Sequence, residues 1–200
     1  MKAKELNRIF KKISFPSQFI SKGNLAYFLL SHKTGAEVLV GFCLSSSIDP
    51  TAFFIQYFVQ CLYVPFSALD FSAGDRIGSY WYENDIININ KIIDAFGDYK
   101  SLKTFGNVVQ YYMEHPYYGN KIGQYMSIGL TFFLQKDYGK SLFYLDRIIN
   151  AKNDENHIWF EQEIENAETI KQCIKCDDYA KGVECILEWQ RVTKNSIKLK

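Results

Sequence analysis

Residues Thr51–Trp81, TAFFIQYFVQCLYVPFSALDFSAGDRIGSYW, open with a long run of aromatic and aliphatic side chains. Between Phe53 and Tyr63 the run is rich in aromatic and β-branched residues, and it stops at Pro65, which favours a strand over a helix. Side chains alternate between the two faces of a strand, and here both faces are largely apolar. We therefore predict a central strand that is covered on both sides.

Two further strand-like segments precede this run, over residues 24–31 and 36–45. Residues 32–35 between them have the length and the glycine of a hairpin loop. Residues 1–13 place apolar side chains at helical spacing with lysines between them, which predicts an amphipathic helix. We expect this helix to cover one face of an antiparallel meander, because packing against a sheet is a commoner fate than lying on a membrane.

Beyond Trp81 the apolar pattern changes from strand to helix. Apolar residues recur every three or four positions, which predicts helices over residues 86–96 and 101–114. The fold is therefore predicted to be α+β, with an N-terminal helix and a small antiparallel sheet of three or more strands in residues 1–82. We expect residues 83–200 to be all-helical and to pack on the sheet as part of one compact unit.

The C-terminal third contains an internal repeat. Residues 136–140 (KDYGK) return as residues 177–181 (DDYAK), 41 positions later when the tyrosines are aligned. Longer helical segments, residues 121–134 and 157–176, precede the two copies. Each unit is therefore predicted to be a helix, a tight turn and a second helix.

This unit resembles the tetratricopeptide repeat, in which a Gly/Asp-Tyr-x-x-Ala-like segment opens the second helix. Ser141 and Gly182 occupy the small-residue position here, and the 41-residue period exceeds the usual period of about 34. The resemblance covers residues 118–193 and implies stacked helical hairpins.

The bulk composition limits the function classes. A chain of 200 residues with 48% hydrophobic and 22% charged residues is globular. Its formal net charge of +1 removes the electrostatic basis for nucleic-acid binding as a main function. No stretch has the length of a transmembrane helix, and five cysteines without a secretory signal predict free thiols in the cytoplasm. The 16% of aromatic residues suits a recognition surface.

The sequence shows no catalytic or metal-binding constellation. His32, His115 and His157 are scattered, without a nucleophile or carboxylate at a recognisable spacing. Cys173 and Cys176 have zinc-ligand spacing, but no second pair accompanies them and a structural zinc site needs four ligands. We therefore expect no catalytic residue, no metal and no cofactor, and we predict that the protein is not an enzyme.

Four polar side chains near the central strand are candidates for ligand or partner contacts. Gln56 and Gln60 interrupt the apolar run, and each either finds hydrogen-bond partners within the fold or contacts a ligand. Arg76 carries a planar fork that suits a carboxylate or backbone carbonyls, so it either clamps its loop to the helical half or binds a ligand. Together with Tyr80, these residues would line a pocket between the sheet and the helices.

The segment over residues 154–168 is strongly acidic. A charge run on a helix is usually its solvated face, but an acidic face also attracts basic proteins. We therefore regard Glu161, Glu165 and Glu168 as candidate contacts for a basic partner.

Residues 58–65 (FVQCLYVP), followed by residues 74–78 (GDRIG) and Trp81, are similar to a phrase in small uncharacterised bacterial proteins. Those proteins have an α+β N-terminal half and a helical C-terminal half, and they read closer to FVQPLYVP, so Cys61 departs from the pattern. Some of them are suspected of acting in bacterial competition or defence loci as immunity-type binders. The resemblance implies no catalytic residues.

Three hypotheses follow from these observations. The leading one is a cytoplasmic bacterial protein-binding module, in its narrower form an immunity protein that neutralises a toxin by covering a basic toxin domain. The alternative is an enzyme or small-molecule-binding protein with a pocket between the sheet and the helices. The third is a structural subunit of a homo-oligomer. No nucleic acid or membrane is expected as a partner.

Overall fold

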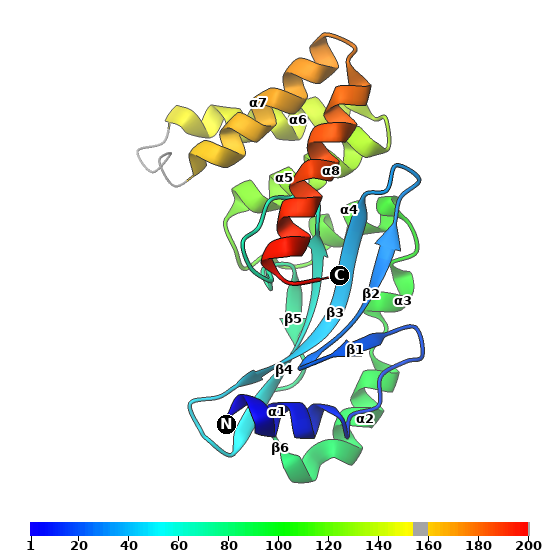
Figure 1. The fold of residues 1–200 in the computed structure, drawn as a ribbon, viewed down its shortest axis with the longest axis vertical. Coiled ribbons are helices and arrows are strands. Elements are labelled where there is room, and N and C mark those ends of the chain that lie inside the picture. The colour runs from blue at the N-terminus through cyan, green and yellow to red at the C-terminus, as the bar shows by residue number, and fades with distance from the viewer. Residues whose placement is uncertain (154–159, 200) are drawn as a thin grey trace.

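The chain is an α+β protein, as predicted (Figure 1). A computed structural model describes residues 1–153 and 160–199. The described strands are β1 (Ile20–Lys22), β2 (Leu25–Ser31), β3 (Glu37–Ser46), β4 (Ala52–Cys61), β5 (Gly74–Arg76) and β6 (Trp81–Tyr82). The described α-helices are α1 (Ala3–Phe10), α2 (Ile86–Ala95), α3 (Asp98–Ser101), α4 (Phe105–Glu114), α5 (Lys121–Leu134), α6 (Tyr138–Ile149), α7 (Glu161–Lys175) and α8 (Tyr179–Ser196). Short 3₁₀ helices occupy Glu83–Asp85 and Asn150–Asn153.

The sheet is antiparallel, in the order β1-β2-β3-β4-β5, and β6 pairs with β4 on the same side as β5. The predicted meander of β2, β3 and β4 and its hairpin loop are confirmed. Residues around Gly74 were expected to form a loop, but residues 74–76 form β5. The backbone comes close enough to β4 at Gly74 for the two segments to pair. A Cβ atom on Gly74 would overlap the carbonyl oxygen of Tyr57, so only glycine lets the chain approach β4 here.

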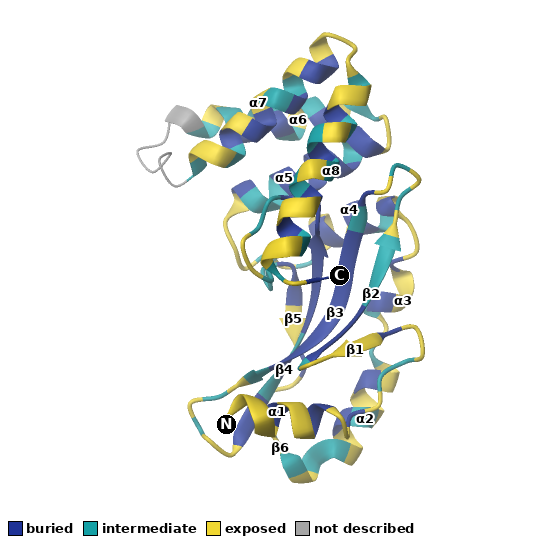
Figure 2. Ribbon diagram, in the orientation of Figure 1, coloured by how far each residue is buried: buried dark blue, intermediate teal, exposed yellow. Residues whose placement is uncertain are grey.

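Alternate residues of β3 and β4 point to opposite faces of the sheet. The first face carries Val40, Phe42 and Tyr57, which pack in the main core with side chains of α1, α2, α3 and α4. Figure 2 shows the long strands as the most buried part of the molecule. The predicted role of α1 as a cover for this face is confirmed by its buried side chains Ile9 and Phe10.

The second face holds a smaller core. The loop of residues 62–73 crosses this face, and its side chains Leu69 and Phe71 pack there. Ile197 and Leu199 at the C-terminal end of the chain cover another part. These segments cover only part of the face, because Phe54 and Gln56 farther along β4 remain partly exposed.

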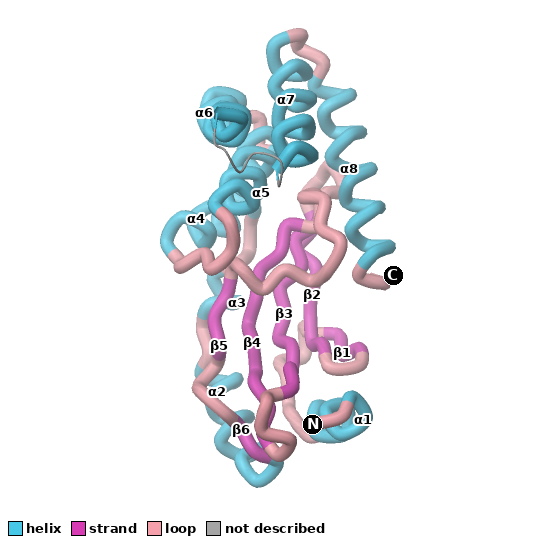
Figure 3. The backbone as a smooth tube through the Cα atoms, turned by 90° about the vertical axis from the view of Figure 1, so that its left-hand side faces the viewer, coloured by secondary structure: helices cyan, strands magenta, loops and turns pink. Residues whose placement is uncertain are grey.

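The two predicted helical hairpins, α5–α6 and α7–α8, extend beyond one end of the sheet (Figure 3). Their tight turns are built alike. Lys136 and Asp177 both adopt the left-handed conformation, with φ of 66° and 56°. The next residues, Asp137 and Asp178, each accept a hydrogen bond from the backbone N–H three positions on, at 3.2 Å in both turns. Each aspartate therefore caps the second helix of its hairpin.

The repeat also places equivalent residues in contact. The rings of Tyr138 and Tyr179 stack with centroids 4.2 Å apart and an interplanar angle of 6°. Ser141 and Gly182, at the small-residue position, are both buried, and a Cβ atom on Gly182 would overlap the Phe133 ring. At position 182 the small residue therefore leaves room for the Phe133 ring of α5.

Two helix boundaries differ from the prediction. Residues 101–114 do not form one helix, because α3 ends at Ser101 and α4 begins only after Thr104, whose side chain caps it. The helix expected over residues 157–176 is α7 from Glu161, and residues 157–159 lie outside the described part of the chain.

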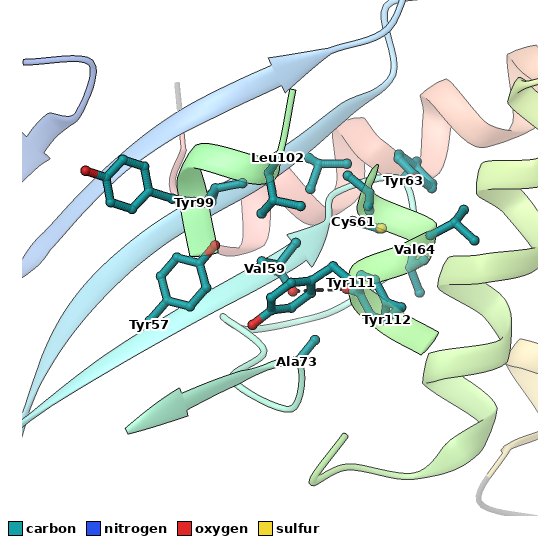
Figure 4. Packing of buried hydrophobic residues seen from close by; sticks show 14 of the residues in the cluster. Tyr57, Val59, Cys61, Tyr63, Val64, Ala73, Tyr99, Leu102, Tyr111 and Tyr112 are labelled. Carbon is teal, nitrogen blue, oxygen red and sulfur yellow. Dashed lines mark hydrogen bonds between the residues drawn. The ribbon is translucent and has the colours of Figure 1, made fainter. Parts of the chain in front are cut away.

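Helices and sheet share one hydrophobic core that includes residues from both segments of the chain. Figure 4 shows Val59 and Cys61 of β4 against Tyr112 of α4, whose hydroxyl donates to the Val59 carbonyl oxygen at 3.0 Å. The Tyr63 hydroxyl and the Thr131 hydroxyl of α5 lie 2.5 Å apart. Cys61 is fully buried, and this burial raises the pKa of its thiol to about 11.

Candidate functional site

Gln60 is part of the fold and is not an exposed contact residue. Its side chain is fully buried, and its amide group forms hydrogen bonds with the loop that crosses the second face. Nε2 donates to the Ala68 carbonyl at 3.3 Å, and Oε1 accepts from the Asp70 backbone N–H at 3.1 Å. Both ends of the amide are thus satisfied, and Gln60 fixes the loop against β4.

Gln56 and Arg76 face each other in register on the neighbouring strands β4 and β5. The Arg76 guanidinium lies 3.9 Å from the centroid of the Phe54 ring, so its contact is with the sheet and not with the helical half, where a clamp was considered. Gln56 Oε1 accepts from the Ser45 hydroxyl at 3.2 Å. Antiparallel pairing therefore brings together two predicted residues that are twenty positions apart.

Tyr80 joins the same group. Its ring centroid lies 4.9 Å from that of Phe54, and its side chain is 52% exposed. Arg76 and Tyr80 therefore both pack on Phe54, which the alternation of β4 places on the same face as Gln56.

A pocket of about 370 Å³ opens beside these residues. It is lined by Gln56, Tyr57, Phe71, Gly74, Asp75, Arg76 and Tyr118. It does not lie between the sheet and the helices, where a pocket was predicted, because core side chains such as Phe42 and Ile93 fill that interface. We call Phe54, Gln56, Phe71, Arg76, Tyr80 and Tyr118 together the Arg76 patch.

The charge of Arg76 is not neutralised by an ion pair. Within residues 1–153 and 160–199, no carboxylate lies within salt-bridge distance of its guanidinium. Asp75 lines the same pocket, and its Oδ1 accepts the backbone N–H of Arg76 at 2.7 Å. The patch thus presents one stacked cation that has no salt bridge among the described residues, beside the Asp75 carboxylate, whose Oδ1 is engaged by the backbone.

The three predicted glutamates lie far from this patch. Glu161, Glu165 and Glu168 are exposed along α7, near the opposite end of the molecule from β6 (Figure 1). Glu161 lies in the first turn of α7, where the helix dipole favours negative charge. The seven predicted residues therefore fall into three places: the Arg76 patch, the buried site of Gln60, and α7. Asp154 and Glu155 of the acidic segment lie outside the described residues.

Among residues 1–153 and 160–199, histidines and thiols do not assemble into a common site. His115 stacks on Tyr111 at 3.9 Å and lies 3.5 Å from an oxygen of Asp98. Cys173 is buried, whereas Cys176 is exposed. In the part of the chain that the structure describes, no three His, Cys, Asp or Glu side chains are placed to hold a metal ion.

A second exposed arginine has a similar setting on the first hairpin. The Arg147 guanidinium lies 4.4 Å from the Phe143 ring centroid and 5.5 Å from that of Tyr125. None of the described pockets is lined by Arg147. Arg147 is therefore a natural comparison for Arg76.

Sequence reasoning missed Phe54, Phe71 and Tyr118. The alternation of β4 was sufficient to place Phe54 beside Gln56. Tyr118 reaches the patch through pairing of its neighbour Tyr117 with Ala73, a long-range contact without a local signal.

Comparison with protein-family models, curated proteins and solved structures finds no match. None of the described helices is long and apolar enough to cross a membrane.

Proposed function

We propose that the chain is a cytoplasmic, non-catalytic protein-binding module and that the Arg76 patch is its main contact surface. The observation that carries this proposal is an arginine that has no ion-pair partner in the described part of the chain and is stacked on Phe54, with the exposed Tyr80 and Tyr118 nearby. Tyrosine and arginine supply much of the binding energy in protein interfaces, typically near the centre of the contact.

Several side chains of the patch already contact one another in the unbound chain. Arg76 and Tyr80 rest on Phe54, and Gln56 is held by Ser45, all on or beside paired strands. Side chains that are already fixed lose less conformational entropy when a partner binds. The open part of the sheet's second face offers the space for a partner, because the loop and the chain end cover only the other part.

The narrower form of the proposal is a bacterial immunity-type protein. It rests on the similarity of residues 58–81 to small bacterial proteins of this kind. Under this proposal the exposed glutamates of α7 attract a basic toxin domain, because an acidic face raises the association rate of cationic proteins. Deletion of charge on α7 would then slow association, and loss of the patch would speed dissociation.

A pull-down from the native host, with this chain as the bait, tests the proposal. The product of the neighbouring gene is the first candidate partner to co-express with it. The Arg76→Gln/Tyr80→Ala variant is expected to lose the partner, whereas the matched Arg147→Gln variant retains it. Equal recovery by all three proteins would remove the patch from the proposal. Sedimentation of the purified protein separates binding of a partner from self-association.

A small-molecule-binding function is the second candidate. The favouring observation is the pocket of about 370 Å³, which lies within the size range of ligand sites. Native mass spectrometry of protein purified from its host tests this function, because a retained small ligand adds a defined mass.

A further inference from the structure

We propose that the pocket beside Arg76 anchors an acidic side chain of the partner protein. This inference rests on the proposed protein-binding function and names the chemistry of the residue that the partner inserts. It is independent of the glutamates on α7, a helix that lies well away from β5 (Figure 1).

The first argument is the hydrogen-bonding capacity of the pocket. The Arg76 guanidinium has planar N–H donors and no carboxylate partner in the described chain. Gln56 Oε1 is occupied by Ser45, while its Nε2 has no hydrogen-bond acceptor among the described residues. Arg76 and Gln56 therefore offer free donors on one side of the pocket, where an incoming acceptor competes with the Asp75 carboxylate. A carboxylate matches the arginine fork with two parallel hydrogen bonds.

The second argument is the apolar wall. Phe71 and Tyr118 line the pocket together with Gln56 and Arg76. Contact between these rings and the methylene groups of an aspartate or glutamate would bury apolar surface on both sides.

Asp75 opposes carboxylate binding, so replacing it tests whether the pocket recognises charge. Its carboxylate lines the same pocket, and Oδ1 already accepts a backbone N–H. Its negative charge weakens binding of an incoming carboxylate. Asp75→Asn keeps an oxygen for the backbone bond and removes the charge, so this variant should bind carboxylates more tightly than the wild type.

The test is an NMR titration of the full chain with three probes of similar size: phenylacetate, phenylacetamide and phenethylamine. Phenylacetate is expected to shift the amide signals of residues 74–77 and the side-chain amide of Gln56. Its affinity should fall at least about tenfold in Arg76→Gln, since the charge-assisted hydrogen bonds to the guanidinium are lost. The affinity should rise in Asp75→Asn and stay unchanged in Arg147→Gln.

Two results would overturn the inference. One is equal or tighter binding of phenylacetamide or phenethylamine, which would show that charge is not recognised. The other is an affinity for phenylacetate that Arg76→Gln leaves unchanged. If the pull-down still shows a partner that depends on the patch, the proposed function survives and only the acidic anchor is lost.

Discussion

Tyr138 and Tyr179 occupy the same position in two successive hairpins, and their rings stack on each other at 4.2 Å. The equivalent tyrosines of the sequence repeat are therefore in direct contact in the folded chain. The stack joins the starts of α6 and α8, each directly after a capping aspartate. We expect this contact to couple the two hairpins in the folded state.

Replacement of Tyr138 and Tyr179 by alanine, singly and together, measures this coupling. The double-mutant cycle should give an interaction free energy of about 0.5–1.5 kcal/mol, the usual value for an aromatic pair beyond its buried area. Urea unfolding of the four proteins provides the measurement. The pair Tyr138 and Tyr82 is the control, since the exposed Tyr82 lies on β6 and should be additive with Tyr138. Additivity of the stacked pair would contradict a stabilising contact.

Gly182→Ala should destabilise the fold by about 1–3 kcal/mol, because the new methyl group overlaps the Phe133 ring in a packed core. Gly139→Ala is the matched control. Gly139 also lies in a helix, and a Cβ atom there meets nothing within 4 Å, so alanine should stabilise by roughly 0.5–1 kcal/mol. Chemical denaturation compares the two variants. Shifts of the same sign would show that the Phe133 ring does not limit the size of residue 182.

Leu199→Ala should destabilise the protein by about 2 kcal/mol, through loss of buried area and the cavity that remains. The Leu199 side chain is 5% exposed and belongs to the second core with Tyr27 and Leu39. Val192→Ala on the exposed side of α8 should change the unfolding free energy by less than about 0.5 kcal/mol. Similar values for both variants in urea would mean that the chain end does not seal the second face.

Alkaline pH should destabilise the protein through the buried thiols of Cys43 and Cys61. Burial raises the pKa of Cys43 and of Cys61 from the ordinary 9.0 to about 11. The folded state therefore holds these protons more tightly than the unfolded state. Their contribution to stability is complete below pH 9 and is lost as the pH rises through 11. By pH 10 the loss should be roughly 1 kcal/mol for each thiol.

Unfolding free energies of Cys43→Ala and Cys61→Ala at pH 8 and pH 10 check this prediction. Each variant should lose less stability between the two pH values than the wild type. Cys176→Ala removes an exposed thiol and should keep the wild-type dependence. Identical slopes in all four proteins would show that the buried thiols titrate normally. Readings at higher pH are less specific, because burial also raises the pKa of Tyr63 and Tyr112.

Long periodic elements were predictable from the sequence, and short paired ones were not. Residues 121–134 were predicted as a helix and form α5 with those bounds, because an asparagine cap and a left-handed turn mark its ends. β5 and β6 contain three and two residues, so they carry no period of their own. Their conformation is set by pairing with β4, which is a long-range interaction.

The same limit applies to the candidate site. The residue types at Gln56, Arg76 and Tyr80 were identified, since polar and aromatic side chains beside an apolar run stand out. Their meeting on Phe54 depends on the β4–β5 register, which the sequence did not reveal. Gln60 shares the face of Gln56, but a loop covers it, and the path of that loop has no local signature.

The alternation of β4 separates two kinds of evolutionary constraint within one strand. Ile55 and Tyr57 fill the main core, so substitutions there must preserve volume. Phe54 and Gln56 point to the open face, where a substitution alters what is recognised while the fold is retained. Related chains that meet different partners should therefore diverge at every second position of this strand, and a change of specificity would need no rearrangement of the scaffold.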